Sequence, residues 1–399
     1  MLKLLEKNSE LESRLADIRM LVLGAGIYHV SLLKEFRALK IITIAASYLP
    51  NDPGLQFADK GLNISSTSID DLAEIIRYEG ITHIITIASD ANTFSQATLN
   101  RNFNFNGLMP FQVEAVSYKP NFFILLNKLQ LPCPETETFY LSERKVETLL
   151  INNPSLIFKP SRGSGSNGIF RNLNELPKNR IGESYLSQRF LEGTDISGQA
   201  ILENGKVTFI AFSEKWAVNG YVPFVHWISP PLYHKIGIEV SREIECISEA
   251  IEFKSGTISL DIRLCEEIPY IIDYSLRLSG NMLIEAINLA FNINLFRYHI
   301  LQTLNLPRRL DSSISDKKIA AIIFGTGKVR KDLDLVKSKI EHLLFHSKII
   351  INQLVWDNLS ESTIFTDSRH RIGHALVSFE NQEDMENIVN QIKEILELE

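Results

Sequence analysis

The chain has 399 residues, of which 45% are hydrophobic and 22% charged, and its formal net charge is -7. This length exceeds what one hydrophobic core usually organises, so two or more domains are expected, and the composition is that of a globular rather than a disordered chain. The acidic balance argues against a nucleic-acid partner, because binding a phosphate backbone requires a surplus of Lys and Arg.

The N-terminus and the cysteines bear on location. Charges interrupt the apolar residues of MLKLLEKNSELESRLADIRM, which predicts an amphipathic helix over residues 1–18 rather than a signal peptide. No window holds 18 uncharged apolar residues, so no membrane span is expected. The three cysteines, Cys133, Cys246 and Cys265, show no CxxC spacing, which argues against a disulfide framework or a zinc knuckle. These features predict a cytoplasmic protein.

Strand and helix patterns alternate in the first part of the chain. Strands are predicted at residues 19–24, 41–45 and 81–87, and helices at residues 27–39 and 69–78. Such alternation is typical of a parallel sheet with helices on its faces. The N-terminal part is therefore predicted to form a Rossmann-like α/β domain, and the rest a set of α+β units.

The later elements follow a different pattern. A helix is predicted from Lys119, stopped by Pro132 and Pro134, and Asn204-Gly205 predicts a hairpin turn. Further strands are predicted at residues 155–159, 185–190, 199–202, 207–213, 221–228, 257–264, 270–274, 318–324 and 374–379, and helices at residues 241–253, 281–289, 329–342 and 382–398. The predicted domains are residues 1–110, 111–185, 186–310 and a C-terminal cap of residues 311–399.

The motif GAGIYH, residues 24–29, lies where a dinucleotide-binding fingerprint would lie. His29 occupies the place of the third glycine, and no acidic residue follows the second strand to hold a ribose. This argues against a bound NAD. A tight strand-to-helix turn, or a small ligand at the helix N-terminus, remains open.

The stretch FKPSRGSGSNGIF, residues 158–170, combines a lysine with a loop of glycine and serine. It is not a P-loop, because Ile169 follows Gly168 where that motif has lysine. Successive backbone amides in such a loop can form a nest for an anion, with Lys159 supplying charge from the preceding strand. A flexible surface loop is the alternative.

Two further stretches carry acids on predicted strands. LSQRFLEGTDIS, residues 186–197, offers a strand edge to a purine and Asp195 to ribose hydroxyls, although an ordinary strand and turn explains this stretch better on its own. Asp261 and Asp273 lie on strands predicted to pair, within reach of one Mg²⁺, which prefers oxygen ligands and shares its shell with phosphates. The alternative is two solvated acids, but an unpaired acid within an apolar strand is costly, which favours a site.

These four elements, in this order, resemble the ATP-grasp ligases over nearly the whole chain. The resemblance implies the ATP-grasp fold, with the first domain similar to the preATP-grasp domain, and binding of ATP with Mg²⁺, for which Mn²⁺ could substitute. Phosphate contacts would come from Lys119, Lys159 and Lys215. The implied loop and hinge residues are Ser161, Gly163, Ser164, Gly165, Ser166 and Gly168 over the phosphates, Gln188, Arg189, Phe190 and Leu191 around adenine, and Asp195 at the ribose.

The resemblance also implies the metal and catalytic residues. Asp261 and Asp273 fall on the magnesium-binding acids, and Arg277 and Lys215 on catalytic positions, with Arg277 steadying an acyl phosphate or a carboxylate. Many members carry Glu-x-Asn-Pro-Arg where this chain has DYSLR, so Ser275 replaces an amide ligand and Asp273 has less reach than glutamate. One of the two usual magnesium sites is therefore expected to be weak, or completed by water.

The activity that the resemblance implies is carboxylate–amine ligation. ATP would convert a substrate carboxylate into an acyl phosphate, and an amine would then form an amide or peptide bond, as in an amino-acid ligase of a specialised pathway. RHRIGHALVSF, residues 369–379, is similar to the carboxylase-like and dipeptide-ligase branches. A bicarbonate-using carboxylase, and a catalytically weak nucleotide-binding regulator or scaffold, remain alternatives. The family is often dimeric, which would make a homodimer of this chain.

Overall fold

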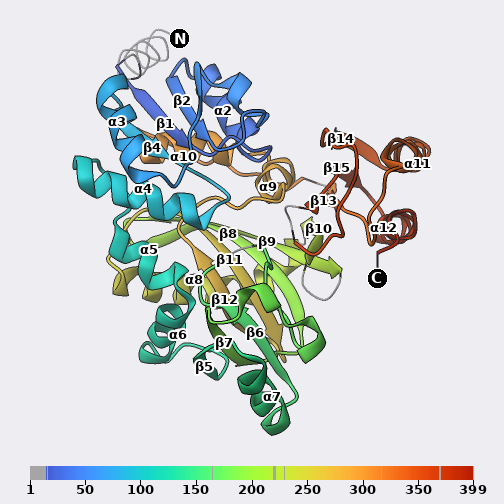
Figure 1. Cartoon of the computed structure of the whole chain (residues 1–399). Coiled ribbons are helices and arrows are strands. Elements are labelled where there is room, and N and C mark those ends of the chain that lie inside the picture. Colours follow the sequence, from blue (N-terminus) through green and yellow to red (C-terminus); the bar gives the residue numbers. More distant parts are fainter. Residues whose placement is uncertain are drawn as a thin grey trace.

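The chain folds into three lobes built around three β-sheets (Figure 1). The computed structural model describes residues 15–398, except residues 16, 164, 219–221, 229, 316 and 368–369. Most of the predicted leading helix, residues 1–18, lies outside the described residues. The predicted combination of a parallel α/β domain with antiparallel α+β units is confirmed. None of the described helices is long and apolar enough to span a membrane.

The N-terminal domain is a four-stranded parallel sheet in the order β3-β2-β1-β4. Sequence patterns missed its edge strand β3, Lys60–Asn63, because three of the four residues are exposed and give no apolar run. The other elements are β1 (Arg19–Leu23), α2 (His29–Ala38), β2 (Ile42–Ser47), α3 (Ile69–Glu79), β4 (His83–Ile85) and α4 (Asp90–Phe103).

A small antiparallel sheet in the order β5-β7-β6 forms the lower lobe of Figure 1. Its β6 leads into the glycine loop, residues 161–169, whose ends are joined by two backbone hydrogen bonds between Phe158 and Phe170, of 2.8 and 3.1 Å. The two rings stack with centroids 4.8 Å apart. The elements here are β5 (Thr136–Tyr140), α7 (Glu143–Asn152), β6 (Leu156–Pro160) and β7 (Ser184–Arg189).

The third sheet has eight antiparallel strands in the order β12-β11-β8-β9-β10-β13-β15-β14. The C-terminal strands therefore belong to the same sheet as the strands that carry the predicted metal residues, although they do not pair with them directly. The strands are β8 (Thr194–Glu203), β9 (Lys206–Val218), β10 (Val222–Ile228), β11 (Gly256–Cys265), β12 (Ile268–Ser275), β13 (Lys318–Phe324), β14 (Ile350–Trp356) and β15 (Gly373–Phe379).

Helices join this sheet to the other lobes. One apolar cluster contains Met20 of β1, Ile287 of α9 and Leu376 of β15, so the N-terminal and C-terminal parts of the chain share a core. The helices not yet named are α5 (Pro110–Ser117), α6 (Lys119–Lys128), α8 (Pro230–Ala250), α9 (Leu283–Phe291), α10 (Leu295–Thr303), α11 (Leu333–Phe345) and α12 (Gln382–Leu396).

The shared core yields a stability prediction on α9. Ile287→Ala should lower the free energy of unfolding by about 2–5 kcal/mol, because Ile287 is fully buried in the cluster and its truncation leaves a cavity. Leu289→Ala on the same helix is the control, because Leu289 is 39% exposed and should change stability by less than about 0.5 kcal/mol. Chemical denaturation measures both, and equal losses would contradict a core shared through this face of α9.

Candidate active site

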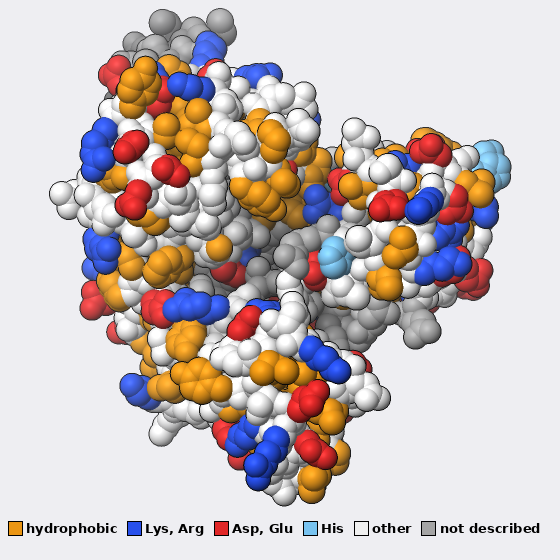
Figure 2. Space-filling view, viewed as in Figure 1, with side chains coloured by type: hydrophobic (Ala, Val, Ile, Leu, Met, Phe, Trp, Pro, Cys, Tyr) orange, Lys and Arg blue, Asp and Glu red, His pale blue; other side chains and the backbone are white. Residues whose placement is uncertain are grey.

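A pocket lies between the three-stranded and the eight-stranded sheets, and most residues predicted from the sequence line it. In the space-filling view a hollow separates the lower lobe from the N-terminal and C-terminal lobes (Figure 2). The pocket brings together Lys119, Lys159, Gly163, Gly165, Ser166, Gln188, Arg189, Phe190, Leu191, Asp195, Lys215, Asp261 and Asp273. The predicted residues that do not line it are Ser161, Gly168, Ser275 and Arg277, and Ser164 is outside the described residues.

Two lysine–aspartate pairs form the charged floor of the pocket. The Nζ atom of Lys119 lies 3.0 Å from Oδ1 of Asp273, and that of Lys215 lies 3.1 Å from Oδ1 of Asp261. The register of β11 and β12 places Asp261 opposite Asp273, so the two pairs are neighbours. Ser197 of β8 donates a hydrogen bond of 2.8 Å to Asp261. Positive and negative side chains thus lie side by side on this floor. A ligand that carries both charges could replace each partner in the two ion pairs.

The pKa values of these groups follow from burial and pairing. Burial works against the charge of Lys119, but Asp273 outweighs it and raises the pKa of Lys119. Lys215 behaves alike: burial opposes its charge, and Asp261 and Asp195 raise its pKa. Burial would raise the pKa of Asp261, yet the Lys215 ammonium holds it below the ordinary value. All three groups are therefore charged at neutral pH.

Lys159 differs from the other two lysines. It lies near the end of β6, is 8% exposed, and makes no ion pair within the described part of the chain. Burial, reinforced by the positive charge of Lys119, lowers the pKa of Lys159 to about 8. A buried ammonium without a counter-ion is unfavourable, so an anion bound between Lys159 and Lys119 would relieve this cost.

The glycine loop is anchored at several points. The backbone carbonyl of Ser161 accepts a hydrogen bond of 3.1 Å from the amide of Lys119, and the ammonium of Lys119 donates one of 3.1 Å to the carbonyl of Gly163. Tyr185 donates its hydroxyl to the carbonyl of Gly168 at 3.1 Å. Gly163 and Gly168 have φ of 145° and 79°, which side-chain-bearing residues rarely adopt. The glycines thus let the loop fold back over the pocket.

Phe190 and several aliphatic side chains line the pocket together with charged residues. Two guanidinium groups lie over the Phe190 ring, that of Arg171 at 3.7 Å and that of Arg263 at 5.3 Å from the ring centroid. Arg263 also pairs with Asp195 at 3.1 Å. The sequence analysis missed Arg263, although it stands two residues after Asp261 and so on the same face of β11. The other apolar residues of its lining include Pro134, Ile157, Ile169, Leu191 and Ile272.

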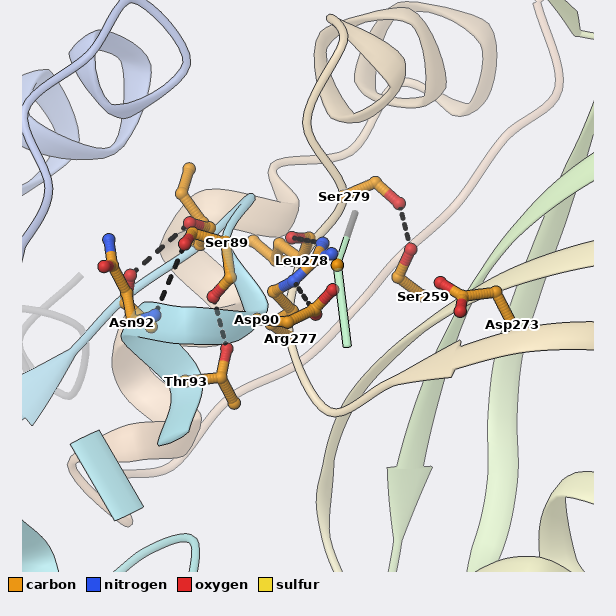
Figure 3. A network of polar contacts seen from close by, with 12 residues as sticks. Ser89, Asp90, Asn92, Thr93, Ser259, Asp273, Arg277, Leu278 and Ser279 are labelled. Carbon is orange, nitrogen blue, oxygen red and sulfur yellow. Dashed lines mark hydrogen bonds and ion pairs between the residues drawn. The ribbon is translucent and has the colours of Figure 1, made fainter. Parts of the chain in front are cut away.

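Arg277 lies against Asp90 of the N-terminal domain (Figure 3), and the Ser275 hydroxyl also hydrogen-bonds to Asp90. The Nε atom of Arg277 donates to Oδ1 of Asp90 at 2.8 Å, and its Nη1 donates to the carbonyl of Leu278 at 3.2 Å. Burial would raise the pKa of Asp90, but Arg277 and the Ser275 hydroxyl bring it below the ordinary value. Asp90 stands in the first turn of α4, 187 residues away in the sequence, and no local pattern predicts this partnership.

The comparisons agree with this geometry. Residues 116–281 match the model of the ATP-grasp domain family, so this part of the chain is an ATP-grasp domain, as the sequence predicts. The match contains every lining residue of the pocket. Among curated protein sequences, none matches the chain significantly.

Solved structures extend the likeness to the whole chain. Phosphoribosylglycinamide synthetase from Anaerococcus prevotii is 18% identical, with 96% of this chain and 99% of that chain covered and a TM-score of 0.69. L-amino acid ligase from Bacillus licheniformis is 13% identical, with 96% and 98% covered and a TM-score of 0.72. N5-carboxyaminoimidazole synthase from Aspergillus clavatus, in complex with ADP and 5-aminoimidazole ribonucleotide, is 13% identical, with 95% and 99% covered and a TM-score of 0.74. The ATP-grasp fold is thereby confirmed.

Lys159 should give nucleotide binding a pH dependence. Phosphate oxygens of ADP bound beside Lys159 would raise its pKa from about 8, so ADP binding would take up a proton as the pH passes above that value. The affinity for ADP should then fall by up to about tenfold per pH unit above pH 8. Calorimetry in buffers of different ionisation enthalpy measures the uptake. Lys159→Met should remove it, while Lys128→Met, exposed at the far end of α6, should not. Absence of uptake between pH 8 and 9 in the unmodified chain would contradict the assignment.

Proposed function

We propose that this ATP-grasp chain is an ADP-forming carboxylate–amine ligase. It binds Mg-ATP in the pocket between the two antiparallel sheets, activates a substrate carboxylate as an acyl phosphate, and couples that carboxylate to an amine. The observation that carries the proposal is the pair of opposed carboxylates, Asp261 and Asp273, each already facing a lysine beside the buried Lys159. We further expect a cytoplasmic protein, with a homodimer as the expected assembly.

The charges of the pocket match those of a metal–triphosphate complex. Five cationic and three anionic side chains are found among its described lining residues, which suits a ligand whose negative charge exceeds that of its bound cation. Mg²⁺ would go to Asp261 and Asp273, whose side chains are 39% and 32% exposed. Lys119 and Lys215, released from those aspartates, would turn to phosphate oxygens. Each lysine–aspartate pair would thus be replaced by a metal–aspartate pair and a lysine–phosphate pair.

Asp261 and Asp273 are the two side chains proposed to bind Mg²⁺. No cluster of three or more metal-binding side chains occurs in the described residues, which suits a hard cation that completes its shell with phosphate oxygens and water. Mg²⁺ bound there would neutralise charge on the transferring phosphoryl group. Ser275 is 2% exposed and hydrogen-bonds to Asp90, so it would reach a metal only after a rearrangement. We therefore propose one strong magnesium site.

The apolar side chains of the pocket suit an adenosine. The apolar residues around Phe190 would hold the base, because an aromatic ring buries well between aliphatic side chains and a fixed phenyl ring. Asp195 would accept hydrogen bonds from the ribose hydroxyls while Arg263 holds its carboxylate in place. Gln188 is 1% exposed and donates to the Thr136 hydroxyl at 2.9 Å, which fixes the strand that carries the base-binding residues.

The chain's own residues would then assist the transfer. Lys119, Lys159 and Lys215 would stabilise negative charge on the phosphates as it redistributes in the transition state. The glycine loop would cover the phosphates and exclude water, which would otherwise hydrolyse an acyl phosphate. Arg277 uses its Nε and Nη1 groups for protein contacts, and its Nη2 group remains to hold a carboxylate or a developing oxyanion.

A bicarbonate-using carboxylase is the second candidate. It is motivated by the N5-carboxyaminoimidazole synthase from Aspergillus clavatus, whose fold this chain shares. The same pocket would phosphorylate bicarbonate instead of an organic carboxylate, since both present an oxyanion to the γ-phosphoryl group. A catalytically weak nucleotide-binding protein is the third candidate, and the inward turn of Ser275 favours it over a fully active enzyme.

Product release over a substrate panel separates these candidates. The chain is incubated with Mg-ATP and amino acids, singly and in pairs, with and without bicarbonate, and ADP and phosphate are measured. Phosphate released only when a carboxylate and an amine are both present supports the ligase. Phosphate that depends on bicarbonate supports the carboxylase. Tight ATP binding without turnover over the whole panel would overturn both enzymatic proposals.

Lys159→Ala tests the site in the same assay, with Lys128→Ala as its matched control. It should lower kcat by about a hundredfold or more, because the buried ammonium that faces the phosphates is lost. Lys128→Ala removes an exposed lysine and should leave turnover unchanged. Full activity in Lys159→Ala would show that the glycine loop and its lysine do not hold the reacting phosphates.

Asp273→Asn should raise the Mg²⁺ requirement. An amide carries no charge to attract the cation, and it also frees Lys119 from its ion pair. The Mg²⁺ concentration for half-maximal turnover should rise about tenfold or more. Asp70→Asn, at an exposed position in the first turn of α3, serves as the control. An unchanged Mg²⁺ titration in Asp273→Asn would remove Asp273 from the metal site.

A further inference from the structure

The loop of residues 276–282 connects β12 to α9 and contains Arg277. The eight-stranded sheet holds this loop through Ser279. The Ser279 amide donates to Oε1 of Gln199 in β8 at 3.0 Å, and the hydroxyls of Ser279 and Ser259 form a hydrogen bond (Figure 3). The position of the loop matters for the proposed function, because Arg277 is the residue that would hold a carboxylate or an oxyanion.

The N-terminal domain holds the same loop through other contacts. The Ala88 amide donates to the Leu278 carbonyl at 3.0 Å, and Ala88 has a φ of 60°, which residues with a side chain rarely adopt. A Cβ atom added to Gly280 would lie 3.1 Å from Cβ of Ala88 and 3.4 Å from Cδ2 of Tyr28. The glycine therefore allows the N-terminal domain to approach the loop closely.

Tyr28 also contacts the C-terminal lobe. The Arg371 guanidinium lies over the Tyr28 ring, with its Cζ atom 4.9 Å from the ring centroid, which is a cation–π geometry. Asp357 pairs with Nε of Arg371 at 3.1 Å and so restrains the guanidinium. Tyr28 therefore lies against the loop at Gly280 and against the C-terminal lobe at Arg371.

We propose that Tyr28 is a positioning residue, which transmits the placement of the C-terminal lobe from Arg371 to the 276–282 loop and so to Arg277. Loss of the ring would leave Gly280 and Arg371 without the group that both contact, and close packing is what fixes such distances. The inference rests on the proposed function only in its last step, the effect of Arg277 on the substrate.

Hydrogen exchange tests the first step without any substrate. The Ala88 and Ser279 amides report on the loop, because their hydrogen bonds join it to the two neighbouring parts of the protein. In Tyr28→Ala both amides should exchange about tenfold faster, because the loop would open locally more often. Tyr28→Phe keeps the ring and should keep the protection, and Tyr78→Ala, which removes an 83% exposed ring, should change nothing. Unchanged exchange in Tyr28→Ala would overturn the proposal.

Gly280→Ala decides the same point if Tyr28→Ala does not fold. The added Cβ atom would press on Ala88 and on the Tyr28 ring, so the Ala88 amide should exchange faster. Gly26→Ala is the matched control, because a Cβ atom there would meet nothing within 4 Å. Equal exchange in Gly280→Ala and the unmodified chain would contradict a loop held by this contact.

A double variant tests whether the C-terminal lobe acts through Tyr28. Arg371→Met removes the guanidinium and should also accelerate exchange of the Ala88 amide. If Arg371 acts on the loop through the Tyr28 ring, Arg371→Met combined with Tyr28→Ala should exchange no faster than Tyr28→Ala alone. Arg309→Met, at an arginine whose side chain is 84% exposed, is the control. Additive accelerations would show that the two residues act independently and would refute the transmission.

Kinetics with a substrate pair from the panel above tests the last step. Tyr28→Ala should lower kcat/KM for the carboxylate substrate about tenfold or more, while ADP affinity stays within about twofold, because Tyr28 is not among the described residues that line the ATP pocket. Faster exchange with unchanged kcat/KM would overturn the link to Arg277. If no substrate of the panel is turned over, the proposed function fails, and the exchange rates still decide whether Tyr28 positions the loop.

Discussion

The pairing of Lys119 with Asp273 and of Lys215 with Asp261 is the interaction on which the rest of the site depends. Four charged groups are held at the edge of a low-dielectric interior, where leaving any one unpaired is costly. They come from α6, β9, β11 and β12, so the strand register and the position of α6 must be correct together. The protein thereby keeps the acids proposed to bind metal and the lysines proposed to bind phosphate charged and close together.

That arrangement ties the two halves of the molecule to each other. Beyond Asp273, β12 ends at Ser275 and the chain turns, so that Arg277 meets Asp90 of the N-terminal domain (Figure 3). The same strand thus carries Asp273, the proposed metal-binding acid, and leads two residues after its end to an interdomain ion pair. Asp273 and Arg277 are only four residues apart along the chain, so the pocket and the interdomain ion pair are close in sequence.

Much of this architecture was predictable because it rests on local patterns. The alternation of strands and helices predicted the parallel domain, and the apolar runs around Asp261 and Asp273 predicted two strands that do pair. The edge strand β3 was not predictable, since it buries little. The presence of Arg263 in the pocket could have been predicted, because Arg263 shares a strand face with Asp261. The Arg277–Asp90 contact could not have been predicted, because no local sequence pattern specifies a partner 187 residues away.

The eight-stranded sheet constrains how the active site can open. Strands β13, β15 and β14 are bonded in series to β10, so the C-terminal lobe cannot swing away without breaking backbone pairing. The three-stranded sheet shares no strand pairing with it among the described residues. Rotation of the smaller sheet with its glycine loop would therefore open the pocket without breaking strand pairing in the larger sheet. The C-terminal strands are held in the larger sheet by continuous backbone pairing, so an opening movement of the smaller sheet would leave them in place.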